Sequence, residues 1–219
     1  MAIFRDYVAA AIIFNLQILP ETVTVGLLIL AVLLASGPVL ALGAGVGGTQ
    51  LLAGAVGRLL MRYAPDNARV VNSADMCNQS YVGKSWARLL GGAANPEQLW
   101  HPWAPSVYQA TVGFISGFGL ALQQLYKEEI NAGVLPQSMM MTVAIVTALI
   151  MLLTLLFRVG SGCDTILGAA GGLGLGLIIG YLGTIALGYA TNRRATNVWG
   201  IPLLRDRINN GSAVYICQT

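Results

Sequence analysis

Residues Ile166 to Tyr189 read ILGAAGGLGLGLIIGYLGTIALGY and contain no charged side chain. At about 1.5 Å per residue, a helix of this length crosses a hydrocarbon core of about 30 Å. Small residues recur at every fourth position of the stretch, namely Gly168, Gly172, Gly176, Gly180, Thr184 and Gly188. This spacing places them on one helix face, where a second helix can approach backbone to backbone. The sequence therefore predicts close helix packing, either with a neighbouring helix of the same chain or with a second copy in a homo-oligomer.

Two further uncharged stretches, Tyr108 to Tyr126 and Met139 to Phe157, are also long enough to cross a bilayer. The first contains a shorter small-residue motif, Gly113 and Gly117, on one helix face. Because the connections between the three stretches are short, residues 108–189 are predicted to form three antiparallel transmembrane helices.

The composition of the whole chain agrees with a membrane protein. Of its 219 residues, 56% are hydrophobic and only 10% are charged, and the mean hydropathy is +0.69. Soluble domains carry about 25% charged residues. The predicted fold class is an all-α integral membrane protein, a bundle of four to five transmembrane helices.

The counts of four and five differ in how residues 22–61 are read. These residues are predicted to form an N-terminal helical hairpin. No residue from Thr22 to Gly57 is charged, but Gly37 and Pro38 are expected to break the stretch into two helices. The pair forms either two short spans or one re-entrant hairpin.

The two ends of the chain are more polar. Residues 1–21 contain Arg5 and Asp6 among apolar neighbours, which favours an amphipathic segment lying at the membrane interface over a cleaved signal peptide. Residues 190–219 are predicted to be an aqueous tail. In it, Asn210 and Gly211 are a typical two-residue turn of a small β-hairpin.

An aqueous loop domain is predicted at residues 62–107. Ser85 and the Asn95–Pro96 pair could each begin a short surface helix, and the second of these would carry Leu99 and Trp100. The loop holds the only histidine of the chain and three of its four tryptophans. Aromatic and arginine side chains are common where proteins dock, so five residues are candidate contacts for a partner: Trp86, Arg88, Trp100, His101 and Trp103.

The three cysteines are divided by the predicted topology. Two membrane crossings separate Cys77 from Cys163, so these two lie on the same side, whereas Cys217 lies on the other. A Cys77–Cys163 disulfide can form if that side of the membrane is oxidising. The alternative is that all three cysteines are free, buried thiols. The lysines and arginines are nearly balanced between the two sides, so the positive-inside rule leaves the orientation open.

Catalysis and transport are both disfavoured by the residue types present. A lone histidine without a zinc-binding or hydrolase motif around it provides neither a metal site nor a triad. The three uncharged stretches that begin at Tyr108, Met139 and Ile166 have no ionisable residue at their centres. We therefore expect no catalytic residue, cofactor or metal. A net charge of +3 without a basic run argues against nucleic acid as a partner.

Three segments carry a family resemblance. They are SWARLLGGAANPEQLWHPWAPSVYQATVGFISGFGLALQQLYKEEI at Ser85 to Ile130, RVGSGCDTILGAAGGLGLGLIIGYLG at Arg158 to Gly183, and SAVYICQT at Ser212 to Thr219. Together they resemble a multi-pass inner-membrane, minor-capsid-associated protein of nucleocytoplasmic large DNA viruses. The resemblance implies a location in the virion inner membrane, which derives from a host membrane. The partners that it implies are the lipid bilayer and other capsid or membrane proteins of the same assembly.

The function expected from these features is structural. The chain would link the inner membrane of a large DNA virus to the capsid layer or to neighbouring copies. The alternative is a small channel or carrier, or an accessory subunit of a membrane enzyme complex.

Overall fold

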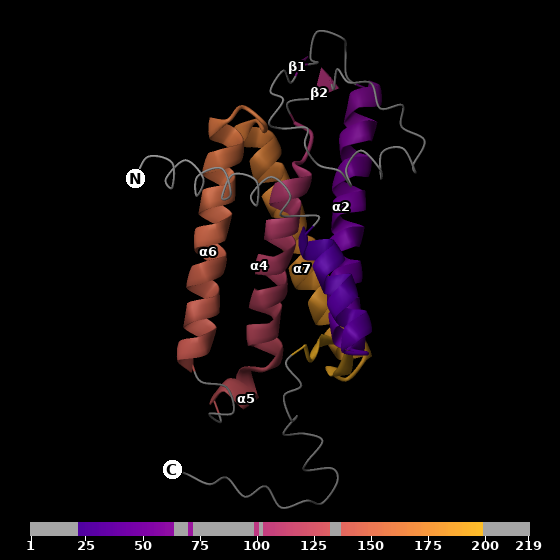
Figure 1. Cartoon of the computed structure of the whole chain (residues 1–219), viewed down its shortest axis with the longest axis vertical. Coiled ribbons are helices and arrows are strands. Elements are labelled where there is room, and N and C mark those ends of the chain that lie inside the picture. Colours follow the sequence, from indigo (N-terminus) through magenta and orange to yellow (C-terminus); the bar gives the residue numbers. More distant parts are fainter. Residues whose placement is uncertain (1–21, 64–69, 72–98, 101–102, 132–136, 199–219) are drawn as a thin grey trace, which may run out of the picture.

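The computed structural model describes residues 22–63, 70–71, 99–100, 103–131 and 137–198, and this part of the chain is almost entirely helical (Figure 1). Long helices run up and down beside one another. In chain order the elements are a helix at Thr22–Leu33, α2 (Gly37–Tyr63), β1 (Val70–Val71), β2 (Leu99–Trp100), α4 (Val107–Leu125), α5 (Lys127–Asn131), α6 (Gln137–Gly160), α7 (Ile166–Ala190) and the 3-10 helix η3 (Arg194–Thr196).

Three helices in the described part of the chain are long and apolar enough to cross a membrane: Gly37–Leu60 within α2, Met141–Gly160 within α6, and Ile166–Ala190, which is α7. The expectation of four to five spans was too high. The Thr22–Leu33 helix is apolar, but its length of about 18 Å is short for a bilayer. α4 is long enough, but it carries Gln109, Gln123 and Gln124, and it lies among the other helices.

The N-terminal hairpin breaks where the sequence predicts it. Ala35, with φ of 46°, turns the chain between the two helices, and α2 then begins at Gly37 with Pro38 in its first turn. Proline is favoured there because the first turn of a helix needs no amide donor. Farther along, the Gln50 side chain donates a 2.8 Å hydrogen bond to the Thr24 hydroxyl, which ties the two antiparallel arms together.

The α4–α7 pair is the centre of the bundle and is held by glycine on both helices. A Cβ atom built at Gly176 would overlap the carbonyl oxygen of Ala110, and one built at Gly113 would overlap the carbonyl oxygen of Leu173. Backbone therefore meets backbone at these positions. α2 and α6 pack against α4 from the outside, and α6 makes little contact with α7.

One local prediction in the loop domain was wrong. Leu99 and Trp100 were expected in a short surface helix, but they form β2, which pairs antiparallel with β1 so that Val70 lies opposite Trp100. Valine and tryptophan favour extended backbone, and a single helical turn after Pro96 has too few hydrogen bonds to compete.

The remaining segment predictions fall on residues whose structure is not described. They are the interfacial segment at 1–21, the first expected surface helix after Ser85 and the hairpin at Asn210–Gly211. The described beginning of the tail is ordered: after α7 the chain turns through η3, which packs against α2.

Candidate functional site

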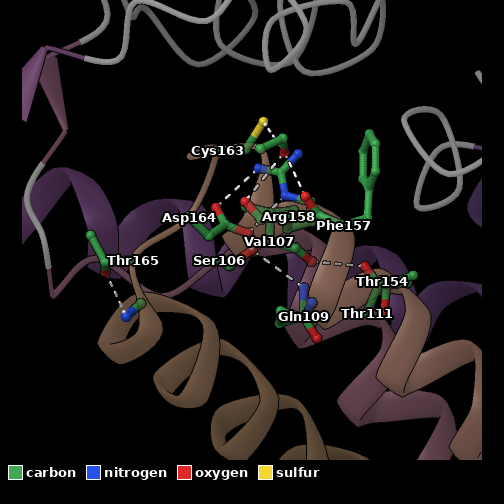
Figure 2. A network of polar contacts seen from close by, with 12 residues as sticks. Ser106, Val107, Gln109, Thr111, Thr154, Phe157, Arg158, Cys163, Asp164 and Thr165 are labelled. Atoms are coloured by element: carbon green, nitrogen blue, oxygen red, sulfur yellow. Dashed lines mark hydrogen bonds and ion pairs between the residues drawn. The ribbon is translucent and has the colours of Figure 1, made fainter. Parts of the chain in front are cut away.

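Polar side chains from three elements meet where α6 turns into α7 (Figure 2). Arg158 comes from the last turns of α6, Asp164 from the connection to α7, and Ser106 and Tyr108 from the start of α4. We call these four residues the turn cluster.

The connection itself folds back onto the end of α6. The backbone amides of Cys163 and Asp164 both donate to the Arg158 carbonyl oxygen, at 2.9 and 3.1 Å. Gly162, with φ of +70°, supplies the left-handed residue that this return needs. As a result, the Asp164 carboxylate is carried back beside the Arg158 guanidinium, six residues earlier in the chain.

The ion pair between these two residues is bidentate. Arg158 donates from Nε to Oδ2 of Asp164 at 2.7 Å and from Nη2 to Oδ1 at 3.0 Å. The side chains are only 4% and 0% exposed. Two parallel charge-assisted hydrogen bonds fix the relative orientation of both groups as well as stabilising them.

Ser106 joins α4 to this pair. Its hydroxyl donates to Oδ2 of Asp164 at 2.6 Å, and its backbone amide donates to the Gly168 carbonyl oxygen at 2.9 Å. The same hydroxyl oxygen accepts a hydrogen bond from the backbone N–H of Gln109 and so caps the N-terminus of α4. One serine therefore connects α4, the turn and α7.

The free face of the guanidinium is covered by an aromatic ring. The central carbon of the Arg158 guanidinium lies 3.9 Å from the centroid of the Tyr108 ring. This is close enough for a cation–π interaction, which is stronger when the cation is removed from water.

This chemistry is that of a clamp. The Asp164 carboxylate accepts hydrogen bonds from both Arg158 and Ser106 and so holds the end of α6 to the start of α4. Within the described ranges, no three His, Cys, Asp or Glu side chains are grouped as metal ligands.

A second polar group, which we call the tail cluster, lies at the opposite end of the bundle and consists of Tyr126, Glu129, Arg193 and Thr196. Arg193 donates to the buried Glu129 carboxylate at 3.2 Å. It does so from a left-handed backbone, with φ of 65°, just after α7. The Tyr126 hydroxyl donates to the Arg193 carbonyl oxygen at 3.0 Å and lies 3.3 Å from the Thr196 hydroxyl.

Burial raises the pKa of the Tyr126 phenol above its ordinary value of 10.0, although the Thr196 hydroxyl and the Arg193 charge lower the pKa in part. The phenol is therefore held neutral, as a hydrogen-bond donor, at physiological pH. The tail cluster joins the end of α4 to α5 and to the segment after α7. The turn cluster joins the start of α4 to the end of α6 and the start of α7.

Gln109, in the first turn of α4, differs from the residues of the turn cluster in its side-chain hydrogen bonding. Its side chain is fully buried, and neither the amide nitrogen nor the oxygen has a hydrogen-bond partner among the described residues. Unsatisfied buried amides are uncommon, because each costs about 1–3 kcal/mol.

The predicted helix-packing residues lie together in the α4–α7 contact. Gly172, Gly176 and Gly180 face the α4 backbone, where an added Cβ would overlap main-chain atoms, and Gly188 faces the Leu125 side chain. Gly168 and Thr184 are buried on the same face, and Gly113 and Gly117 meet α7 from the other side. Since α4 fills this face within one chain, the face is not open to a second copy.

The five predicted docking residues are only partly described. Trp86, Arg88 and His101 lie outside the described residues, and only the backbone of Trp100 is described, in β2. The Trp103 side chain is 65% exposed just before α4. The structure does not bring the five together as a described surface.

Cys163 is disulfide-bonded, and its partner lies outside the described residues. Because Cys77 is in that undescribed part, the Cys77–Cys163 pairing stays a prediction.

Neither ion pair was predicted from the sequence. A signal for the turn cluster was available, since Arg158 and Asp164 flank a glycine-containing turn between two apolar helices. The Glu129–Arg193 pair had no such signal, because 64 residues separate its members.

Comparison with protein-family models, curated proteins and solved structures finds no match to this chain.

Proposed function

We propose that this protein is a structural membrane protein, a rigid helical scaffold that holds its aqueous segments in fixed positions at the bilayer surface. The observation that carries the proposal is the clamping of both ends of the bundle by ion pairs, the buried Arg158–Asp164 pair and the partly buried Glu129–Arg193 pair. Apolar residues can often replace a buried ion pair without loss of stability, so we assign to these pairs the role of fixing the geometry of the bundle.

The outer surface of the bundle supports a membrane setting. α6 exposes a row of large apolar side chains, among them Met141, Ile145, Leu149, Leu153 and Leu156, each more than half exposed. An apolar surface of this size is unfavourable in water and suits contact with lipid chains.

The distribution of charge supports a structural role over transport. α4, α7 and α6 before Arg158 contain no charged residue. Ions and coupled substrates usually need ionisable groups within the membrane. The charged groups of the two clusters are instead neutralised by each other at the ends.

The more specific part of the proposal is that the scaffold belongs to the inner membrane of a large DNA virus and links it to the capsid layer or to neighbouring copies. Its support is the sequence resemblance in the segments after Ser85. In this setting the loop containing Trp103 is the segment presented to a capsid or membrane protein.

Fractionation of purified virions tests this assignment. The chain should co-purify with particles, remain with them after a protease treatment that removes outer proteins, and be released when detergent dissolves the inner membrane. A chain found only in host membranes, and absent from particles, would contradict the virion assignment.

A channel or carrier is the second candidate, and buried polar side chains favour it. Gln50 donates to the Thr111 hydroxyl at 3.1 Å, between α2 and α4. Gln109, whose side chain has no partner among the described residues, lies two residues earlier on α4, about half a turn around the helix. Ion or solute flux through liposomes containing the purified chain, reduced by replacing Gln109 with leucine, would support this candidate. Liposomes that remain sealed would support the scaffold.

A further inference from the structure

The disulfide at Cys163 is located in a part of the fold that the turn cluster depends on. The Cys163 side chain is 3% exposed, and its backbone amide donates to the Arg158 carbonyl oxygen at 2.9 Å. The Ser161 hydroxyl lies 3.2 Å from the Cys163 sulfur. A covalent bond at this position therefore fixes the same turn that carries Asp164 to Arg158.

The position of Cys163 in the bundle is also defined. It follows α6, at the end where α2 finishes and α4 begins, whereas α5 and η3 lie at the other end (Figure 1). α6 and α7 are both long and apolar enough to cross a membrane. In a bilayer, the Cys163 end and the η3 end therefore face different compartments.

We infer that the Cys163 end of the bundle faces an oxidising compartment and the η3 end a reducing one. Disulfides persist where thiols are not kept reduced, outside the cytosol or in the lumen of secretory organelles. When the bond forms, two thiols lose two electrons and two protons. The disulfide of a compartment oxidoreductase accepts them by thiol–disulfide exchange and becomes a dithiol.

The identity of the partner cysteine follows from the same topology. The chain has three cysteines. In the sequence, Cys217 follows η3, whereas Cys77 comes between the end of α2 and the start of α4, both of which lie at the Cys163 end of the bundle. The bond is therefore expected to join Cys163 to Cys77 and so attach the loop domain to the clamped turn.

This inference rests on the membrane setting of the proposed function but not on the virion assignment. A chain that is absent from virions but correctly oriented would contradict only the assignment. A chain present in virions with the opposite orientation would contradict only the inference.

Insertion of the full-length chain into sealed microsomes derived from the endoplasmic reticulum tests the orientation. With an epitope tag after Thr219, protease added outside should remove the tag. Complete protection of the tag, with digestion restored only when detergent opens the vesicles, would overturn the inferred orientation.

The redox state is measured on the same preparation. After alkylation without reductant and digestion, mass spectrometry should find Cys163 linked to Cys77, and Cys163 should become alkylated in the Cys77→Ser variant. The matched variant Cys217→Ser should leave the Cys163 linkage intact. An alkylated Cys163 in the unaltered chain would overturn the inference, whatever the result with the tag.

Discussion

Asp164 is the residue on which most contacts of the turn cluster converge. Replacing it with asparagine keeps the side-chain shape but leaves the buried Arg158 guanidinium without a counter-charge. We expect Asp164→Asn to lower the free energy of unfolding by about 3–5 kcal/mol, measured by unfolding of the purified chain in detergent micelles.

Two comparisons make this result specific. Glu128→Gln removes an exposed carboxylate in α5 and should change stability by less than about 0.5 kcal/mol. The double variant Arg158→Leu with Asp164→Leu should recover much of the loss, because apolar residues can replace a buried ion pair. If Asp164→Asn is no worse than Glu128→Gln, the clamp has no energetic role.

Substitution of Gln109 is expected to change stability in the opposite direction. Since neither polar atom of its side chain has a partner in the described part of the chain, Gln109→Leu should leave stability unchanged or raise it by about 1–3 kcal/mol. The matched variant Gln50→Leu breaks hydrogen bonds to Thr24 and Thr111 and should lose about 1 kcal/mol for each. A loss at Gln109 as large as that at Gln50 would mean that this amide has a partner in the native assembly.

Tyr126 makes stability depend on pH at the tail cluster. Its pKa is raised in the folded chain, so its contribution is complete below the unfolded pKa of about 10 and is lost as the pH rises through the folded value. The Tyr126→Phe variant should be less stable than the unaltered chain at neutral pH, by about 1 kcal/mol. Melting temperatures recorded from pH 7 to pH 11 should converge for the two chains, and parallel curves would contradict the role of the phenol.

At the level of the helices, the α4–α7 contact offers a comparison within α7 itself. An added methyl group at Gly176 meets α4 main-chain atoms, whereas nothing lies within 4 Å of the Cβ position at Gly174. Gly176→Ala should therefore destabilise the chain by about 1–3 kcal/mol. Gly174→Ala should be neutral or stabilising, because alanine favours a helix by about 1 kcal/mol.

Thermal unfolding of Gly176→Ala and Gly174→Ala in the same detergent tests this difference in stability. Equal melting temperatures for Gly176→Ala and Gly174→Ala would show that close backbone approach is not needed. Gly176→Leu, with a larger side chain, should lose more than Gly176→Ala because the two helices must move farther apart.

These helices also mark how far the sequence predicts the fold. Glycine spacing in α7 predicts a packing face, because only glycine lets backbones touch, and Gly37 with Pro38 predicts the hairpin break. The spacing does not identify the helix that fills the face, since Gly113 and Gly117 on α4 and a second copy of α7 are equally compatible with it. Arg193 was not recognised as a site residue, because its pairing with Glu129 depends on the left-handed backbone after α7.

On the scale of the whole molecule, the bundle has a tight centre and looser flanks. α4 buries ten residues, many of them against α7, whereas only about a tenth of the residues in the apolar part of α6 are buried. Hydrogen exchange in lipid nanodiscs should therefore report slower exchange for α4 and α7 amides than for the Thr22–Leu33 helix. Uniform exchange across the helices would indicate a single cooperative unit without a separate centre.

The reciprocal arrangement of glycines on α4 and α7 has a consequence for how this protein can change over generations. In an ordinary core, a larger residue can be accommodated when a second substitution makes a neighbouring side chain smaller. Here the neighbouring atoms belong to the main chain, so no such second substitution exists. Suppressors of a substitution at Gly113 or Gly176 would therefore have to slide or tilt an entire helix. Such a movement would also strain the Ser106–Asp164 hydrogen bond at one end and the Glu129–Arg193 ion pair at the other, so this contact leaves the chain almost no route of gradual repair.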